Sequence, residues 1–307
     1  MNMKNPLVSV IIPTYNRAHL VERAINSVLN QTYQDFEIIV VDDCSNDDTE
    51  AVIKRFHDPR IRYIRHEKNQ GGSAARNTGI RASHGEIIAF LDSDDEWMPE
   101  KLFEQVRVLR EDPNCDAVYT DIYFVHEDGK MITHRFPKVN GNIYYELLKK
   151  NVVGTTSTVL LRRQCFDTVG LFDESLPSCQ DWDMWIRISK NYKFRKIDKP
   201  LVKYKWHQVQ ISKNIEAVQR GHEKIMEKYK EEICALGCHI ESMHYFHLGN
   251  LLCHLGKIEQ GRKYLFKAVL KSPLQLKNSI YLLSACLGKK AFEKLARIKR
   301  IVFSVKN

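Results

Sequence analysis

LVSVIIPTYNR, residues 7–17, decides the fold, because an almost continuous apolar run passes directly into a polar loop that begins with proline. A run without polar alternation predicts a strand that is covered on both faces. The pattern returns in FEIIVV at 36–41 and EIIAFL at 86–91, and helix-period segments at 18–30 and 73–81 lie between the strands. Strands that alternate with helices predict crossover units and a mostly parallel sheet.

Polar residues follow these strands at the points where the strands end. The first strand leads into Pro13, Thr14 and Tyr15, the second into Asp43, and the later strand into the acidic run 92–95. Open parallel sheets bind ligands outside the carboxyl ends of their strands, near the switch point of strand order. We therefore expect an aromatic ring, backbone amides and several carboxylates to meet at one edge of the sheet.

The chain is long enough for two domains, because its 307 residues are about twice the ~150 residues of one domain. Residues 1–212 predict an α/β domain, with further strands at 116–124 and 157–162. Residues 213–307 are almost purely helical in pattern and contain one tetratricopeptide-like helical pair. The small and apolar residues at its defining positions are Tyr245, Leu248, Gly249, Leu252, Gly261, Leu265, Ala268 and Pro273.

Composition narrows the class of protein. Hydrophobic residues make up 43% and charged residues 28%, which excludes a disordered or collagen-like chain. The net charge of +9 suits anionic partners, but no nucleic-acid-binding module is recognisable, so no nucleic-acid partner is expected. Eight scattered cysteines without a CxxC pair, and no leader or membrane-spanning run, favour a reduced cytoplasmic protein.

Asp92, Ser93 and Asp94 form the strongest chemical signal, because they directly follow a buried apolar strand. A hard divalent cation prefers carboxylate oxygens and leaves positions open for phosphate oxygens. Two carboxylates one residue apart would present one to a metal and the other to a sugar hydroxyl. The alternative is an ordinary turn at the end of a strand, where Asp and Ser are common. The other polar strand ends at the same edge favour a functional site.

Four ordered blocks resemble the inverting family 2 glycosyltransferases of the GT-A fold. The blocks are VSVIIPTYNR (8–17), DFEIIVVDDCSNDDT (35–49), NQGGSAARNTGI (69–80) and EIIAFLDSDDEWMPEKL (86–102). The resemblance covers residues 7–210. It implies a Rossmann-like, mostly parallel sheet flanked by helices, and the transfer of a sugar from a nucleoside diphosphate sugar.

The resemblance implies a nucleotide site at the first two strand ends. The loop of Pro13, Thr14 and Tyr15 would hold the base, and Asp43 would accept a hydrogen bond from a pyrimidine ring. The chemistry of these residues fits, because an ionised Asp only accepts hydrogen bonds and the Tyr15 ring offers a stacking face worth ~1–3 kcal/mol per base. A UDP-linked donor is therefore expected.

The resemblance also implies a diphosphate and metal site. Asp92 would face the ribose or sugar beside Ser93, and Asp94 would bind Mn²⁺ or Mg²⁺ that bridges the diphosphate. His207 matches a position where a histidine completes the metal shell or contacts the diphosphate, although its loop departs from the usual spacing. Arg76, near the start of the predicted helix 73–81, would approach the diphosphate, and a solvated helix arginine is its alternative.

The block QDWD at 180–183 is the second predicted site. In the family that it resembles, the aspartate at the position of Asp181 is the base. Inverting transfer needs a group that removes the proton of the acceptor hydroxyl as the new bond forms. The alternative is an N-cap of the following helix, a role that aspartate often has.

We therefore expect a metal-dependent inverting glycosyltransferase whose acceptor is a glycan or lipid-linked glycan of envelope polysaccharide synthesis. The alternatives are a nucleotidyltransferase acting on a sugar phosphate and an inactive transferase-like interaction protein. A nucleotidyltransferase would need a Gly- and Lys-rich phosphate loop, which PTYNRAHL at 13–20 does not offer. The basic tail 289–307 suits either an anionic membrane surface, at the inner face of the cell membrane, or a solvated helix face. The oligomeric state stays open.

Overall fold

The computed structural model describes residues 6–126, 128–205 and 214–295. Contacts within the chain divide it into two compact units. The α/β unit consists of Met1–Leu147, Asn151–Leu176 and Gln180–Gln208, and the helical unit consists of Leu148–Lys150, Pro177–Cys179 and Val209–Asn307. The domain boundary between residues 212 and 213 stays a prediction. The predicted ligand His207 and most of the basic tail lie outside the described residues.

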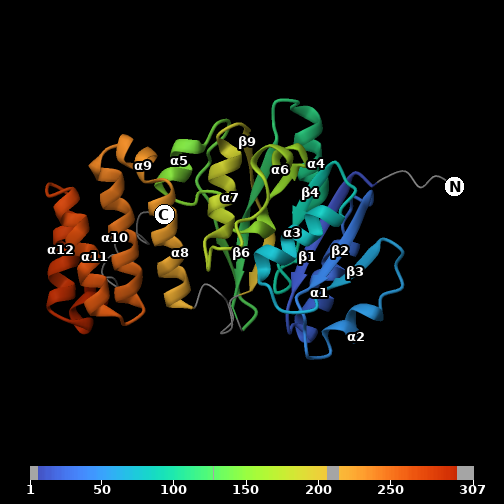
Figure 1. Ribbon diagram of the computed structural model, residues 1–307, viewed down its shortest axis with the longest axis horizontal. Helices are drawn as coiled ribbons and strands as arrows, with labels where there is room; N and C mark the ends of the chain where they lie inside the picture. Colours follow the sequence, from blue (N-terminus) through green and yellow to red (C-terminus); the bar gives the residue numbers. More distant parts are fainter. Residues whose placement is uncertain (1–5, 127, 206–213, 296–307) are drawn as a thin grey trace. The chain divides into compact units, whose positions relative to one another are not determined.

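Strands and helices alternate through the first part of the chain, as the sequence predicts (Figure 1). In chain order they are β1 (Val8–Thr14), α1 (Ala18–Leu29), β2 (Phe36–Asp42), α2 (Thr49–Lys54), β3 (Ile61–Arg65), α3 (Gly72–Ala82), β4 (Ile87–Phe90), β5 (Glu96–Trp97) and α4 (Lys101–Glu111). The next elements are β6 (Ala117–Val125), β7 (Met131–His134), α5 (Tyr144–Lys149), the 3-10 helix η1 (Thr156–Thr158), β8 (Leu160–Arg162), α6 (Gln164–Val169), α7 (Gln180–Ser189) and β9 (Phe194–Lys205).

One sheet joins the strands in the order β3-β2-β1-β4-β8-β6-β9-β5, and β7 pairs with β6. The four strands from β3 to β4 are mutually parallel, which is the pattern that the buried runs predict. Beyond β4 the sheet is mixed: β8 is antiparallel to both β4 and β6, and β9 is parallel to β6. The sheet as a whole is therefore mixed, and its parallel half carries the loops of the predicted site.

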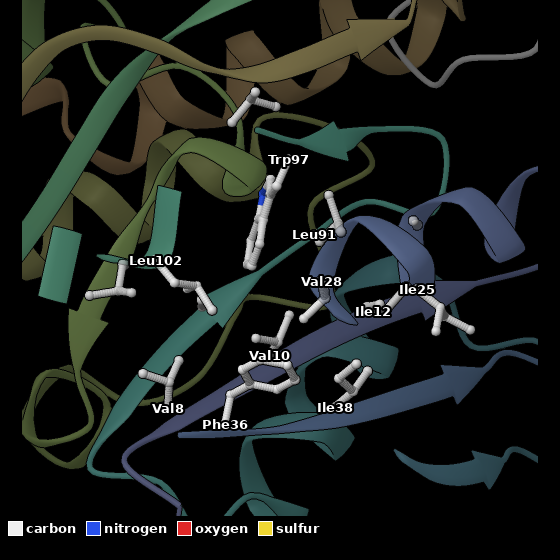
Figure 2. Close-up of a cluster of buried hydrophobic side chains, with 14 of the residues drawn as sticks. Val8, Val10, Ile12, Ile25, Val28, Phe36, Ile38, Leu91, Trp97 and Leu102 are labelled. Atoms are coloured by element: carbon white, nitrogen blue, oxygen red, sulfur yellow. The ribbon is translucent and has the colours of Figure 1, made fainter. Parts of the chain in front are cut away.

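Apolar side chains cover both faces of the parallel half. Every residue of β1 and of β2 is buried, which confirms the prediction of a strand covered on two sides. Alternate residues of β1 face a core with α1 and α4, as Figure 2 shows for Val8, Val10 and Ile12. On β2, Ile39 and Val41 pack against α3 instead. These two helical layers fix the strand ends, and with them the loops that follow.

Helices form the part of the helical unit that follows β9 (Figure 1). They are α8 (Ile215–Lys228), α9 (Lys230–Ala235), α10 (Cys238–His254), α11 (Ile258–Lys271) and α12 (Leu276–Cys286). None of the described helices is long and apolar enough to cross a membrane.

The predicted helical pair consists of α10 and α11, which approach each other at two glycines. A Cβ atom on Gly249 would lie 2.9 Å from the carbonyl oxygen of Gly261. A Cβ atom on Gly261 would lie 2.3 Å from the Sγ atom of Cys253. Glycine inside a helix costs about 1 kcal/mol relative to alanine. The close approach of the two backbones explains why both positions nevertheless carry glycine.

Candidate active site

The end of β1 presents one aromatic ring. Pro13 and Thr14 are the last two residues of the strand and are buried, whereas the Tyr15 side chain is 43% exposed. The hydroxyl oxygen of Thr14 is buried and lacks a hydrogen-bond partner. Tyr15 is therefore the member of this loop that offers a face to a ligand.

Hydrogen bonds tie the loops after β1 and β2 together, and two of them involve Asn16. The backbone N–H of Asn16 donates to Oγ of Ser45 (2.8 Å), and the backbone N–H of Asn46 donates to Oδ1 of Asn16 (2.9 Å). Asn16 and Cys44 both adopt positive φ angles, of 50° and 69°. Left-handed backbone at residues other than glycine is a feature of binding and catalytic loops. The two loops thus have a defined shape in the unliganded chain.

Asp42 and Asp43 have different surroundings although they are adjacent. Asp42 is fully buried and accepts hydrogen bonds from the Ser45 hydroxyl (2.5 Å) and the Tyr63 hydroxyl (2.7 Å). These contacts lie within the turn that follows β2 and between β2 and β3. The role of Asp42 is therefore to shape the loop.

Asp43 anchors the segment that precedes α3. Its Oδ1 accepts hydrogen bonds from the backbone N–H of Gln70 (2.9 Å) and from Nδ1 of His66 (2.8 Å), and its Oδ2 accepts from the N–H of Gly71 (2.7 Å). A carboxylate has about four acceptor positions. Three are used within the protein, which leaves one for a ligand. The contact of Asp43 with a nucleotide base stays a prediction.

Arg76 of α3 forms an ion pair with the first carboxylate of the DSD motif. Its Nη2 lies 2.5 Å from Oδ1 of Asp92, and its side chain is only 14% exposed. The alternative of a solvated helix arginine is therefore wrong. The Nε–H of Arg76 is buried and lacks a partner within the protein. This leaves a buried donor beside Asp92.

Two hydroxyl residues, which sequence reasoning missed, complete the surroundings of Asp92. The Thr156 hydroxyl lies 3.2 Å from each carboxylate oxygen of Asp92. The Ser157 hydroxyl accepts from the backbone N–H of Asp92 (3.0 Å) and donates to Oδ2 of Asp95 (2.7 Å). The only signal in the sequence is the polar cluster 154–158, which resembles an ordinary loop. The segment around η1 therefore orients the acidic loop after β4.

Three carboxylates lie close together in this loop. Burial, and then the negative charges of Asp94 and Asp92, raise the pKa of Asp95 well above its usual range. One carboxylate oxygen of Asp95 is buried and lacks a hydrogen bond. Ser93 is buried, whereas Asp94 is half-buried. A bound cation would relieve the mutual repulsion of these groups.

Asp181 lies inside the first turn of α7, because the helix begins at Gln180. The alternative reading of this residue as the N-cap is therefore wrong. The backbone N–H of Trp182 donates to Oδ1 of Asp181 (2.8 Å), and Nδ2 of Asn151 lies 3.4 Å from its Oδ2. Asn151 is a further neighbour that the sequence did not identify.

Electrostatics link Asp181 to the acidic loop. Burial raises the pKa of Asp181 to about 6, the Trp182 N–H and the positive charge of Arg76 oppose this shift, and the charge of Asp92 adds to it. Arg76 and Asp92 are thus close enough to influence the ionisation of Asp181. The structure therefore brings together the predicted base, the predicted diphosphate ligand and the DSD motif, from parts of the chain about 100 residues apart.

The donor set at the acidic loop fits a hard cation that is shared with a substrate. Among the residues that the structure describes, no three His, Cys, Asp or Glu side chains form a complete metal site. Mg²⁺ and similar ions are commonly held by one or two carboxylates together with substrate phosphates. Asp94, with Asp92 beside it, supplies oxygen ligands of this kind, and one buried oxygen of Asp95 in the same loop has no hydrogen-bond partner among the described residues.

Buried polar atoms without partners among the described residues concentrate around the site, in its loops and in α3. Of the eight such side-chain atoms in the described part of the chain, five belong to segments at the strand ends or beside them. These five belong to Thr14, Ser73, Arg76, Asp95 and Thr155. Natural structures leave few buried polar groups unsatisfied. A polar ligand in this region would provide the missing partners.

Comparison with protein families and curated proteins agrees with this geometry. The family model described as "Glycosyl transferase family 2" matches residues 9–170. The chain is 33% identical over 214 residues to "UDP-Glc:alpha-D-GlcNAc-diphosphoundecaprenol beta-1,3-glucosyltransferase WfgD" of Escherichia coli, and the match covers 69% of this chain and 82% of that protein. An uncharacterized glycosyltransferase of Rickettsia felis is 35% identical over 225 residues, and the match covers 70% of this chain but only 36% of that longer protein.

Solved structures share the fold at low sequence identity. S. aureus TarS 1-349 in complex with UDP-GlcNAc has a TM-score of 0.65 and 21% identity, over 95% of this chain and 91% of that chain. The mannosyltransferase PcManGT from Pyrobaculum calidifontis, in complex with GDP-Man and Mn²⁺, has a TM-score of 0.60 and 20% identity, over 98% of this chain and 81% of that chain.

Proposed function

The chain belongs to glycosyl transferase family 2 and has the GT-A fold, and from this membership we propose that it transfers a sugar from a UDP-sugar to a hydroxyl of a glycan or lipid-linked glycan, with inversion at the anomeric carbon. One observation carries the proposal most directly. Asp181, whose pKa is raised to about 6, interacts electrostatically with Arg76 and Asp92. This supports a base at Asp181, beside groups suited to a diphosphate and a sugar.

The donor site is proposed at the ends of β1, β2 and β4. Tyr15 would stack on the base, and the remaining acceptor position of Asp43 would receive an N–H of uracil. Pro13 and Thr14 would form the floor of this loop, and Ser93 would line the sugar side. Similar proteins support a nucleotide sugar, because the name of WfgD specifies UDP-Glc and the TarS structure contains UDP-GlcNAc.

A lipid-linked acceptor is proposed on chemical grounds and by similarity. The name of WfgD specifies a sugar diphosphoundecaprenol as its acceptor. Base-assisted transfer needs only an acceptor hydroxyl within reach of Asp181. For this chain we therefore propose a growing glycan of envelope polysaccharide synthesis, attached to a lipid carrier.

The mechanism follows from the positions of the chain's own groups. The Asp181 carboxylate removes the proton of the acceptor hydroxyl as its oxygen attacks the anomeric carbon. The bond from that carbon to the diphosphate oxygen breaks on the opposite face, so the configuration inverts. Arg76, which is held by Asp92, would stabilise the negative charge of the diphosphate. A divalent cation, Mn²⁺ or Mg²⁺, held by Asp94 and by the proposed ligand His207, would neutralise further charge on the leaving group.

The reaction type is tested by the products. With UDP-sugars, Mn²⁺ and a lipid-linked acceptor, we expect UDP and a longer glycan, measured by coupled UDP detection and mass spectrometry. The reaction of UTP with a sugar phosphate should release no pyrophosphate. Pyrophosphate release would instead assign a nucleotidyltransferase. A chain that binds donors but turns over none of the UDP-, GDP-, CDP- or dTDP-sugars would be the inactive interaction protein.

The pH profile should report the ionisation of Asp181. The base must be deprotonated, and its pKa of about 6 lies above the usual value of an aspartate. We therefore expect log kcat/KM to rise with unit slope below pH 6 and to level off above it. Donor binding, followed by thermal shift with UDP over the same pH range, serves as the control. A profile that is flat between pH 5 and 7 would contradict the assignment of Asp181 as the base.

A further inference from the structure

The last helices of the described chain expose apolar side chains that a soluble helix normally buries. Six of them, on α11, on α12, in the turn between these helices and at the residue after α12, are 50% to 94% exposed. This apolar stripe consists of Leu270, Leu274, Leu276, Ile280, Leu283 and Leu287. Exposed apolar patches of this kind mark interaction surfaces.

On α12 the exposed residues form one continuous side of the helix. Leu276, Ile280, Leu283 and Leu287 follow one another at intervals of four, three and four residues, which places them on a single face. The opposite side is already packed, because Tyr281 and Ala285 are buried in a core with Leu265 and Phe292. The apolar stripe is therefore additional to the core, and α12 is apolar on two sides.

The sequence around the apolar stripe is strongly basic. Residues 260–292 contain no Asp or Glu. Their cations are Arg262, Lys263, Lys267, Lys271, Lys277, Lys289 and Lys290. Lys271 pairs with Glu241 (2.8 Å) and Lys267 lies over the ring of Tyr264 (5.3 Å), but the segment keeps a large excess of positive charge.

The exposed apolar side chains and the excess of positive charge together distinguish between two candidate occupants of the apolar stripe. A second copy of the chain, placed symmetrically on the apolar stripe, would bring two basic segments together, and like charges across an interface are unfavourable. An anionic lipid surface accepts leucine side chains at the acyl boundary and lysines at its headgroups. We propose that the apolar stripe of α11 and α12, with its flanking lysines, docks the chain onto an anionic membrane surface.

The proposal goes beyond the chemistry of the active site. Its apolar anchors all precede the basic tail 289–307, which contributes only the cations Lys289 and Lys290. Docking would bring the enzyme to the layer where a lipid-linked acceptor lies. Membrane docking can be measured without any donor sugar, so its test is separate from the test of the transferase activity.

Vesicle sedimentation of the full chain tests the proposal. We expect binding to phosphatidylcholine vesicles containing about 30% phosphatidylglycerol, and at least tenfold weaker binding to phosphatidylcholine alone or in about 0.5 M NaCl. The double substitution Ile280→Glu/Leu283→Glu should reduce binding at least tenfold. Phe103→Glu is the matched control, since Phe103 is a 49% exposed apolar residue of α4, and it should bind as the unaltered chain does.

Several outcomes would overturn the proposal. Anionic vesicles that bind the double variant and the unaltered chain equally would place the contact elsewhere. A dimer in sedimentation velocity that Ile280→Glu/Leu283→Glu dissociates, without vesicle binding, would assign the stripe to a second copy. Melting curves check that the variants fold. If the double variant unfolds, Lys263→Gln/Lys290→Gln replaces it, because both side chains are exposed, and binding to anionic vesicles should again fall severalfold.

Discussion

Asp181→Asn is expected to lower the kcat of sugar transfer by about 10²–10⁴-fold, the usual contribution of a positioned general base. Asparagine has almost the same shape as aspartate, so the contacts with the Trp182 N–H and Asn151 remain largely available. It cannot accept the proton of the acceptor hydroxyl. We therefore expect an unchanged affinity for UDP, measured by calorimetry, together with the loss of turnover.

The same substitution on another helix provides the control for this result. Asp167 also lies in a first turn, that of α6, and its side chain is exposed. Asp167→Asn should leave kcat within about twofold of the unaltered chain, as is usual for surface substitutions. If Asp181→Asn kept most of the activity, another group would have to remove the proton. A loss of UDP binding together with kcat would instead indicate a structural role for Asp181.

Asp94→Asn is the second substitution with a large expected effect. Removing the proposed ligand should lower kcat/KM by about 10²–10³-fold, which is typical for the loss of one stabilising group at a developing charge. It should also abolish the difference between UDP binding with and without Mn²⁺. Thermal shift with UDP and with UDP plus Mn²⁺, measured for both proteins, separates nucleotide affinity from the effect of the metal.

Asp95 supplies the matched control for Asp94. Its side chain is only 1% exposed, one of its oxygens accepts a hydrogen bond from the Ser157 hydroxyl (2.7 Å), and burial and the charges of Asp94 and Asp92 raise its pKa. Asp95→Asn should therefore retain the effect of Mn²⁺ on UDP binding. Equal losses in the two variants would show that the acidic loop acts through its fold rather than through a ligand at Asp94. Retention of the Mn²⁺ effect in Asp94→Asn would reject Asp94 as the ligand.

Local patterns predict the parallel half of the sheet and the residue types of its loops. The runs at 36–41 and 87–91 are buried on both faces, so their composition alone identifies β2 and β4. The polar residues after them meet at one edge because parallel strands end on the same side of a sheet. The sequence could thus identify Tyr15, Asp43 and Asp92 as candidate site residues.

The mixed half of the sheet was harder to predict, because β9 does not look like a strand. Its sequence FRKIDKPLVKYK contains four lysines or arginines before Tyr204, together with a proline. Lys196 is nevertheless buried, since it forms an ion pair with Asp121 of β6 (2.9 Å). An interior charge pair between distant residues leaves no apolar periodicity, so the sequence gives no signal of a strand.

Contacts between distant residues also could not be predicted from the sequence. The Arg76–Asp92 pair and the hydroxyls of Thr156 and Ser157 depend on how α3 and η1 pack around β4. Asn151 reaches Asp181 through a tight turn in which its own side chain accepts the N–H groups of Val153 and Gly154. Asn151, Thr156 and Ser157 belong to no motif with fixed spacing. Only the tertiary arrangement shows them.

The hydrogen bonds of Asn16 with Ser45 and Asn46, which join the loops after β1 and β2, have a consequence for ligand affinity. A flexible loop loses conformational entropy when a ligand orders it, and that loss weakens binding. Here the left-handed backbones of Asn16 and Cys44, tied by cross-loop hydrogen bonds, are ordered when the chain folds. The proposed nucleotide site is accordingly preorganised, and more of the free energy of stacking and hydrogen bonding would be available as affinity.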